Sequence, residues 1–261
     1  MNYSAIISFV LALGIIFWAA LSSTDDPKSF LDVHGIVIVF GGTVAATAIS
    51  YQLKQTFLMI KVFWGRTVKS QPMNFEALIR QIMKIADSYR NENSDLKTLI
   101  EDNRDEFLKE GMRLLLDEIV EIDHLITLLK LRNATIFECY SADAVKFKSM
   151  GKYPPAMGLM GAVLGMIALL AGLGKPGAEK TIGPSMSIAL VATLYGIALA
   201  NLIIIPIGEN LTASAKEINR KNLIIIESIK LIHAKTNPLV LGEELNSFLL
   251  PKERIDWKKS A

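Results

Sequence analysis

Four apolar stretches of this sequence lack the ionisable residues that ion chemistry in a membrane normally requires. Each is about 20 residues long, enough to cross a bilayer as a helix, and none contains Asp, Glu, Lys or Arg: residues 3–22, 34–51, 154–173 and 184–207. A protein that moves ions across a bilayer normally places an ionisable group at membrane depth, where that group binds and releases the ion. These stretches offer hydroxyl and amide groups instead, among them Thr43, Thr47, Thr193 and Asn201. Two hypotheses follow: the chain moves no ions, or a partner's helix supplies the titratable group.

Other kinds of site find little support in the sequence. The three histidines, His34, His124 and His233, are scattered, and no glycine-rich phosphate loop or zinc-ligand spacing occurs. The single cysteine, Cys139, excludes an internal disulfide framework and fits a cytoplasmic position. A net charge of only +2 argues against nucleic acid as a partner. We therefore expect a protein that is not an enzyme and that holds neither cofactor nor metal.

The apolar stretches predict an all-α, polytopic membrane protein. Hydrophobic residues make up 51% of the 261 residues, and the mean hydropathy is +0.35. The third and fourth stretches are joined by the short polar segment 174–183, so they form a transmembrane hairpin. We predict four transmembrane helices, with a helical cytoplasmic domain between the second and the third.

The basic residues orient these spans. Of the 28 Lys and Arg residues, only Lys28, Lys175 and Lys180 lie in the two short connections between paired spans. Cytoplasmic segments near membrane helices carry an excess of Lys and Arg. The short connections therefore face outward, and both termini and the long segment are cytoplasmic.

The remaining chain is predicted to be helical and polar. Segment 54–70 is expected to continue the second membrane helix outward, and Asn74 is a suitable N-cap for an amphipathic helix that starts at Phe75. After a charged helix up to about Ala234, we expect an irregular tail. The predicted domains are 1–51 (two spans), 52–152 (cytoplasmic), 153–207 (the hairpin) and 208–261 (cytoplasmic helix and tail).

Small residues recur at helical spacing in the hairpin. Gly161 and Gly165 stand four apart in the third span, and Ala192, Gly196 and Ala200 do so in the fourth. Such ridges let helix backbones approach closely in lipid. They are explained either by packing within one bundle or by a helix from another chain. With Thr193, Tyr195 and Asn201 between them, we favour a partner's helix docking on these faces.

The whole chain resembles the MotA/PomA family of flagellar motor stator subunits. The most specific motifs are Pro155-Ala-Met-Gly-Leu-Met-Gly-Ala-Val-Leu-Gly165 and Ile182-Gly-Pro-Ser-Met-Ser-Ile-Ala-Leu-Val-Ala-Thr-Leu-Tyr-Gly196. Supporting pieces are Phe40-Gly-Gly-Thr43, Phe107-Leu-Lys-Glu-Gly111 and Asn237-Pro238. The order of two spans, a cytoplasmic domain of about 100 residues, two more spans and a basic tail also matches the family.

The resemblance implies a motor subunit of the bacterial inner membrane. Five copies, a homopentamer, would surround two copies of a MotB-type partner, whose transmembrane helix carries an ion-binding aspartate and whose outer domain grips peptidoglycan. Ion flow past that aspartate would turn the ring, and the cytoplasmic domain would push on the rotor protein FliG through charged side chains. Membrane lipid is the remaining expected contact.

The resemblance also assigns roles to individual residues of the spans. Pro155 and Pro206 match the two family prolines at the cytoplasmic ends of the third and fourth spans, and are expected to act as hinges. Thr193 matches the hydroxyl that faces the partner's aspartate. Ala162 stands where sodium-driven members carry Thr, and because an alanine methyl cannot ligate a dehydrated Na⁺, we predict that the chain uses protons rather than sodium ions.

The rotor contact is where the sequence departs from the family. Arg90 matches the rotor-facing arginine, but the acid that the family places eight residues later is Thr98 here. We therefore assign the acidic contact to Glu101, and add Arg104 as a further rotor-facing charge.

Three other functions remain alternatives. An ExbB/TolQ-like energiser belongs to the same mechanical class, but such proteins usually have one span before the cytoplasmic domain rather than two. A secondary transporter would need its own site at the membrane midplane, and the sequence shows none. A purely structural membrane scaffold would show no ion dependence with its partner present.

Overall fold

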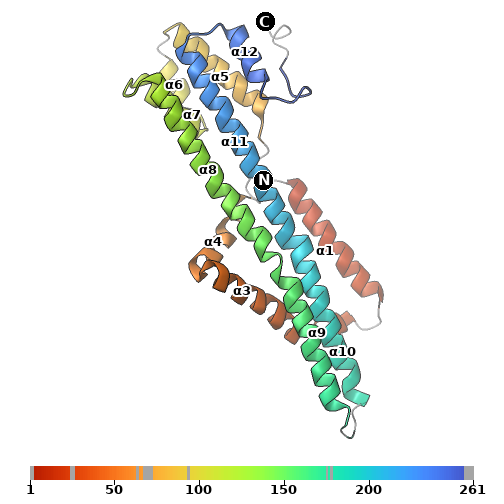
Figure 1. The fold of residues 1–261 in the computed structure, drawn as a ribbon. Helices are drawn as coiled ribbons and strands as arrows, with labels where there is room; N and C mark the ends of the chain where they lie inside the picture. The colour runs from red at the N-terminus through yellow and green to blue at the C-terminus, as the bar shows by residue number, and fades with distance from the viewer. Residues whose placement is uncertain are drawn as a thin grey trace. The chain divides into compact units, whose positions relative to one another are not determined.

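The computed structural model describes residues 3–23, 27–62, 65–66, 73–92, 95–174, 176 and 179–255 (Figure 1). These residues are helical or in turns and short connections, and no strand occurs among them, which confirms the expected all-α class. The chain divides into two compact units. Unit 1 comprises 1–71 and 141–213, and unit 2 comprises 72–140 and 214–261.

Unit 1 contains the apolar helices. They are α1 (Tyr3–Ser23), the 3₁₀ turn η1 (Pro27–Phe30), α2 (Val33–Ile36), the π-helical η2 (Val37–Gly41), α3 (Gly42–Tyr51), α4 (Leu53–Val62), α9 (Tyr153–Gly172), α10 (Glu179–Ala198) and the π-helical η4 (Leu199–Ile204). Among the described residues, three helical stretches are long and apolar enough to cross a membrane: Val33–Tyr51, Ile122–Gly172 and Ile182–His233. A shorter apolar helix covers Val10–Ser23.

Two expectations for unit 1 need correction. The second span does not continue into 54–70, because Gln52 has φ 63° and ψ 144° and separates α3 from α4; positions 63–64 and 67–70 lie outside the described residues. The polar turn 174–183 is also shorter than expected. Helix α10 already begins at Glu179, since Thr181, Ile182 and Gly183 continue its helical backbone.

Unit 2 is built from α5 (Phe75–Arg90), α6 (Leu96–Glu101), α7 (Glu106–Leu116), α12 (Pro238–Asn246), and parts of the long helices α8 (Ile122–Met150) and α11 (Ile205–His233). Its core is aliphatic, with these fully buried side chains: Ile79, Ile82, Ile85, Leu108, Met112, Leu125, Leu129, Ile225, Ile229, Ile232, Leu241 and Leu245. The expected segments 52–152 and 208–261 thus contribute to one shared core, while their exact boundaries remain predictions.

Side-chain caps set where the helices of unit 2 begin. The side chain of Asn74 accepts a hydrogen bond from the Ala77 amide at 3.0 Å, as the sequence predicted, and Asp105 caps α7 in the same way through Leu108. A cap of this kind satisfies an amide that has no partner within the helix. At Asn237 the same device starts α12, because its side chain accepts from the Leu239 amide at 3.0 Å.

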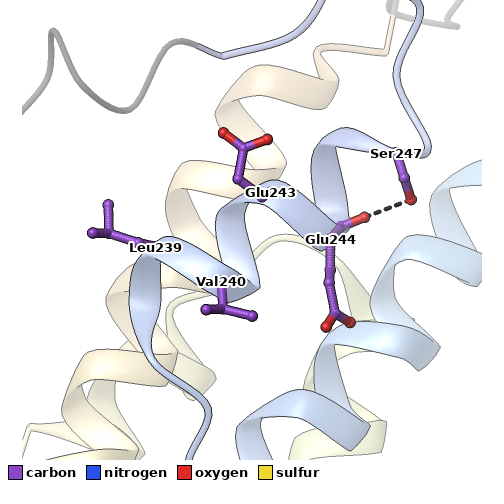
Figure 2. Close-up of a pocket in the computed structure, with 5 residues that line it drawn as sticks. All are labelled: Leu239, Val240, Glu243, Glu244 and Ser247. Carbon is purple, nitrogen blue, oxygen red and sulfur yellow. Dashed lines mark hydrogen bonds between the residues drawn. The ribbon is translucent and has the colours of Figure 1, made fainter.

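The expected irregular tail is therefore wrong for residues 238–246, which form α12. Leu241 and Leu245 stand one turn apart and are fully buried, so this short helix is held by packing. Its opposite face, with Leu239, Val240, Glu243 and Glu244, is exposed, and the Ser247 hydroxyl donates to the Glu244 carbonyl at 2.6 Å (Figure 2).

A buried asparagine helps to hold the segment after α12. Asn246, 4% exposed, donates to the Ile255 carbonyl at 2.9 Å and accepts from the Ile255 amide at 3.0 Å. Asn246→Ala removes both bonds and leaves buried backbone groups unpaired, at a cost of about 1–3 kcal/mol. We expect limited proteolysis of the full chain to cleave between α12 and Ile255 several-fold faster in this variant. Ser247→Ala, at an exposed neighbour, is the control and should leave the cleavage rate unchanged.

Candidate functional site

The contact between α9 and α10 is made by small residues that bring the two backbones together. A Cβ built on Gly158 would lie 2.8 Å from the Ala192 carbonyl oxygen, and one on Gly165 would lie 3.0 Å from the Ser185 carbonyl oxygen. A Cβ on Gly196 would collide with the Pro154 carbonyl oxygen. Real Cβ atoms essentially never come as close as they would at Gly158 and Gly196, so only glycine permits the approach there, and a side chain at Gly165 would require its neighbours to shift. The two helices run antiparallel, because residues with increasing numbers along α9 contact residues with decreasing numbers along α10.

The second span packs into the same junction. A Cβ on Gly42 would lie 2.6 Å from the Met157 sulfur, and one on Gly35 would lie 3.4 Å from the Ala192 Cα. Nearer the end of the span, the hydroxyls of Ser50 and Tyr153 are hydrogen-bonded at 2.7 Å. Ala192 is fully buried where these helices meet.

The small-residue faces that were expected to receive a partner's helix also pack within the chain, and their contact with a partner stays a prediction. Gly161, Gly165 and Gly196 are buried against helices of their own chain, and Ala192 and Ala200 are fully buried. Of the two explanations considered from the sequence, packing within one bundle therefore accounts for these faces.

The polar groups expected along the ion pathway are occupied by the protein's own backbone. The Thr193 hydroxyl donates to the Ala189 carbonyl at 3.1 Å, and the Asn201 amide donates to the Ile197 carbonyl at 3.1 Å. The Tyr195 hydroxyl donates to the Phe30 carbonyl, so it ties α10 to η1 rather than joining Thr193. Thr43 and Thr47 are buried and donate to carbonyls one turn back in their own helix.

Three residues remain partly open to a ligand or partner. Asn201 is exposed, and Ala162 and Thr193 are half-buried. Asn201 lies on a stripe of exposed apolar side chains that follows α10 and η4 at helical spacing: Met186, Leu190, Leu194 and Ile197. This stripe was not recognised from the sequence, because an evenly apolar helix does not show which of its faces its own chain will cover.

The two candidate hinge prolines lie in different settings. Pro155 is in the first turn of α9, where a proline removes no helical hydrogen bond. Pro206 is the second residue of α11, one residue after η4, whose wider π-helical turns accommodate a residue that lacks an amide hydrogen and crowds the preceding turn. A hinge role remains a prediction for both residues.

The candidate rotor residues are exposed side chains of unit 2. Arg90 is the last residue of α5, Glu101 is the last residue of α6, and Arg104 lies in the loop before α7. Glu101 accepts two hydrogen bonds from the Arg113 guanidinium of α7, at 2.6 and 2.9 Å. These two hydrogen bonds hold the pKa of the Glu101 carboxyl below its ordinary value. Arg113 was missed by sequence analysis, because a pair separated by twelve residues and a loop has no local pattern.

The helical fold and the apolar membrane-spanning stretches of unit 1 define a polytopic helical membrane protein. Comparison with known proteins shows its family. Residues 100–222 match the MotA/TolQ/ExbB proton channel family. The chain is 30% identical to the chemotaxis protein PomA of Vibrio alginolyticus over 220 residues, which cover 84% of this chain and 85% of that protein.

Two solved structures show the same fold. The C. jejuni MotAB structure matches 98% of this chain and 99% of that chain, with a TM-score of 0.83 and 26% identity. A chain of the flagellar MotAB stator complex from Bacillus subtilis also matches, over 98% of this chain and 98% of that chain, with a TM-score of 0.85 and 24% identity. This chain belongs to the MotA/PomA flagellar stator subunits of the MotA/TolQ/ExbB family.

Two glycines of the same helix test the close contact between α9 and α10. Gly196→Ala places a methyl against the Pro154 carbonyl and must push the helices apart, at a cost of about 1–3 kcal/mol. Gly183→Ala, where no atom lies within 4 Å, should be neutral or stabilise α10 by up to about 1 kcal/mol. Thermal unfolding of the purified full chain measures both. Equal unfolding temperatures for the two variants would show that the helices do not touch at Gly196.

The ion pair between Glu101 and Arg113 predicts a pH dependence. Because folding lowers the pKa of Glu101, the pair stabilises unit 2 above the unfolded glutamate pKa, and this stabilisation is lost as the pH falls through the folded value. The wild type should unfold at a higher temperature than Arg113→Gln at neutral pH, and the difference should vanish at a pH below the glutamate range. A difference that persists in acid would assign the role of Arg113 to packing.

Proposed function

We propose that this stator subunit forms its ion channel only together with a partner that supplies the titratable group. The observation that carries the proposal is the state of the polar groups in α9, α10 and η4. Their hydroxyls and amides are bonded to backbone carbonyls, and residues 182–207 contain no carboxylate. Since an ion crossing the bilayer needs a group that binds and releases it, that group comes from another chain. A MotB-type subunit with a carboxylate in its single span has the required chemistry.

The partner's helix is proposed to dock on the exposed stripe of α10 and η4 rather than on the glycine faces. Met186, Leu190, Leu194 and Ile197 are 37–69% exposed and form one apolar face. Asn201 continues this face, and Thr193 borders it. A carboxylate arriving there would meet an amide and a hydroxyl that can reorient toward it. Five copies arranged around two partner helices, as the family resemblance implies, would bury this stripe at the centre of the ring.

The proposed topology has four spans, with both termini in the cytoplasm of a bacterial cell and the spans in its inner membrane. It is supported by the antiparallel neighbours in unit 1: Ser50 meets Tyr153, and Gly42 meets Met157, so the second and third spans run in opposite directions. Helix α1 supplies the first span and contacts η4. Two spans before unit 2 favour a stator subunit over an ExbB/TolQ-like energiser, the alternative within the same family.

The transported ion is proposed to be a proton. A dehydrated sodium ion needs several oxygen ligands, because burying an uncoordinated charge is prohibitive. Ala162 offers a methyl group in place of an oxygen ligand. A proton needs only the partner's carboxylate.

Rotation measured against each ion gradient separates the two ions. We expect the swimming speed of cells that depend on this stator to fall to zero with a protonophore, and to stay unchanged when external sodium is replaced by potassium. The matched variant is Ala162→Thr, which adds one hydroxyl. Because sodium needs several oxygen ligands, this single change should leave the swimming speed independent of sodium. A speed that tracks sodium while a protonophore has no effect would contradict the proton assignment.

Unit 2 is proposed to push on the rotor protein FliG through exposed charges. Arg90 and Arg104 are exposed, and Glu101 reaches a rotor only by sharing or leaving Arg113. Single exposed charges contribute weakly, so the double variant Arg90→Glu with Arg104→Glu is the informative one. It should stop rotation while proton flux through the assembled complex is preserved. Loss of flux in this variant would show that the two arginines maintain the structure instead.

A further inference from the structure

The outward face of α12 carries an open apolar pocket bordered by two carboxylates. Leu239 and Val240 line the pocket in the first turn of the helix and are 57% and 48% exposed. Glu243 and Glu244 follow one turn later, and Ser247 completes the lining (Figure 2). The pocket has a volume of about 540 Å³. These residues form the α12 face, which has no partner in unit 2, although the other side of the helix is buried in the core.

The two carboxylates of the α12 face lack a cationic partner. Neither Glu243 nor Glu244 forms an ion pair with any residue that the structure describes, whereas Glu253, a few residues later, pairs with Arg220 at 3.1 Å. Both side chains are exposed. The face therefore fits an occupant that combines an apolar side chain with adjacent cationic groups.

The chain after α12 returns to the edge of this face. Ile255 is 7% exposed, and the Asn246 side chain holds both its amide and its carbonyl, at 3.0 and 2.9 Å. Asn246 stands three residues after Glu243 and seven after Leu239, so the three lie along one side of the helix. Leu239 is about 10 Å from Asn246 along the axis, and about three residues of extended chain cover that length. The residues that follow Ile255 are thus within reach of the pocket.

The sequence after Ile255 has the chemistry that the face requires. Residues 256–261, which lie outside the described residues, read Asp-Trp-Lys-Lys-Ser-Ala. Trp257 has a large ring that is mostly apolar, of the kind that contributes most to docking when it is buried. Lys258 and Lys259 follow it directly, so two cations accompany the ring, while the single acid, Asp256, stands next to the anchored Ile255.

We propose that residues 257–259 dock on the α12 face of their own chain. The indole ring covers the two aliphatic side chains of the pocket, and the lysine ammonium groups lie beside the two glutamates. Burial of the ring supplies most of the attraction, whereas the exposed charge pairs mainly orient the segment. The anchor at Asn246 favours this segment over any separate protein, because it keeps the segment at a high effective concentration beside the face. The apolar surface of α12 is thereby closed by the chain itself.

A disulfide between the segment and the face tests the proposal. The variant carries Val240→Cys and Lys258→Cys in a Cys139→Ser background, because Cys139 is exposed and would also react. On mild oxidation of the purified full chain, we expect the two thiols to disappear while the chain keeps the mobility of a single copy on a non-reducing gel. The matched control replaces Val240→Cys by Lys97→Cys, an exposed position on α6, and should keep its thiols at least several-fold longer.

Two outcomes of this experiment would overturn the proposal. Thiols that disappear no faster than in the control would show that the segment does not occupy the face. A disulfide that joins two chains would give the face to a neighbouring copy instead. The measurement needs neither a partner protein nor ion flux, so it is independent of the proposed channel.

Reversing the charge of the face tests the role of the lysines. Glu243→Lys with Glu244→Lys, added to the same cysteine pair, should slow disulfide formation several-fold, because the face then repels the segment. The control is Glu118→Lys with Glu121→Lys, which changes the net charge equally at two exposed positions outside α12 and should leave the rate unchanged. Equal slowing in both variants would assign the effect to net charge and contradict docking on this face.

Discussion

The close approach of α9 and α10 is the interaction on which the arrangement of the spans depends. Between helices in lipid there is little hydrophobic driving force, so association depends on how closely their surfaces fit. Gly158 and Gly196 allow backbone to meet backbone, and Ala192 is enclosed by glycines of α2 and α9. The second span is placed by the same junction, through Gly35, Gly42 and the hydrogen bond between Ser50 and Tyr153.

This packing restricts where the ion chemistry can occur. The small-residue faces are filled by the chain itself, and the hydroxyls of Thr43 and Thr47 are buried with backbone acceptors. The proposed location is the exposed apolar stripe of α10 and η4, with Asn201 on it and Thr193 at its edge. On this proposal the subunit supplies a mostly apolar surface, and a partner supplies the charge that the ion needs. The π-helical turns of η4 lie in this stripe and end two residues before Pro206.

Much of the fold could be predicted from sequence because its signals are local. The apolar lengths, the 3.6-residue period of α5 and the Asn74 cap are each readable within one or two turns. What failed required knowledge of contacts. Gln52 carries no turn signal although its positive φ ends α3, and α12 is too short to be recognised without the core that buries Leu241 and Leu245. For the site, the residue types could be predicted, but the neighbours that each side chain faces could not. The glycine ridges pack on each other, and the ion-pair partner of Glu101 lies on another helix.

Proton flux into vesicles, with and without the partner, tests the central claim most directly. The full chain is reconstituted alone, with a single-span subunit that carries a carboxylate in its helix, and with the same subunit after replacement of that Asp by Asn. If the titratable group must be delivered by another chain, flux appears only with the intact partner and is absent from the other two preparations. Flux through the chain alone, or flux that survives the Asn replacement, would contradict the account.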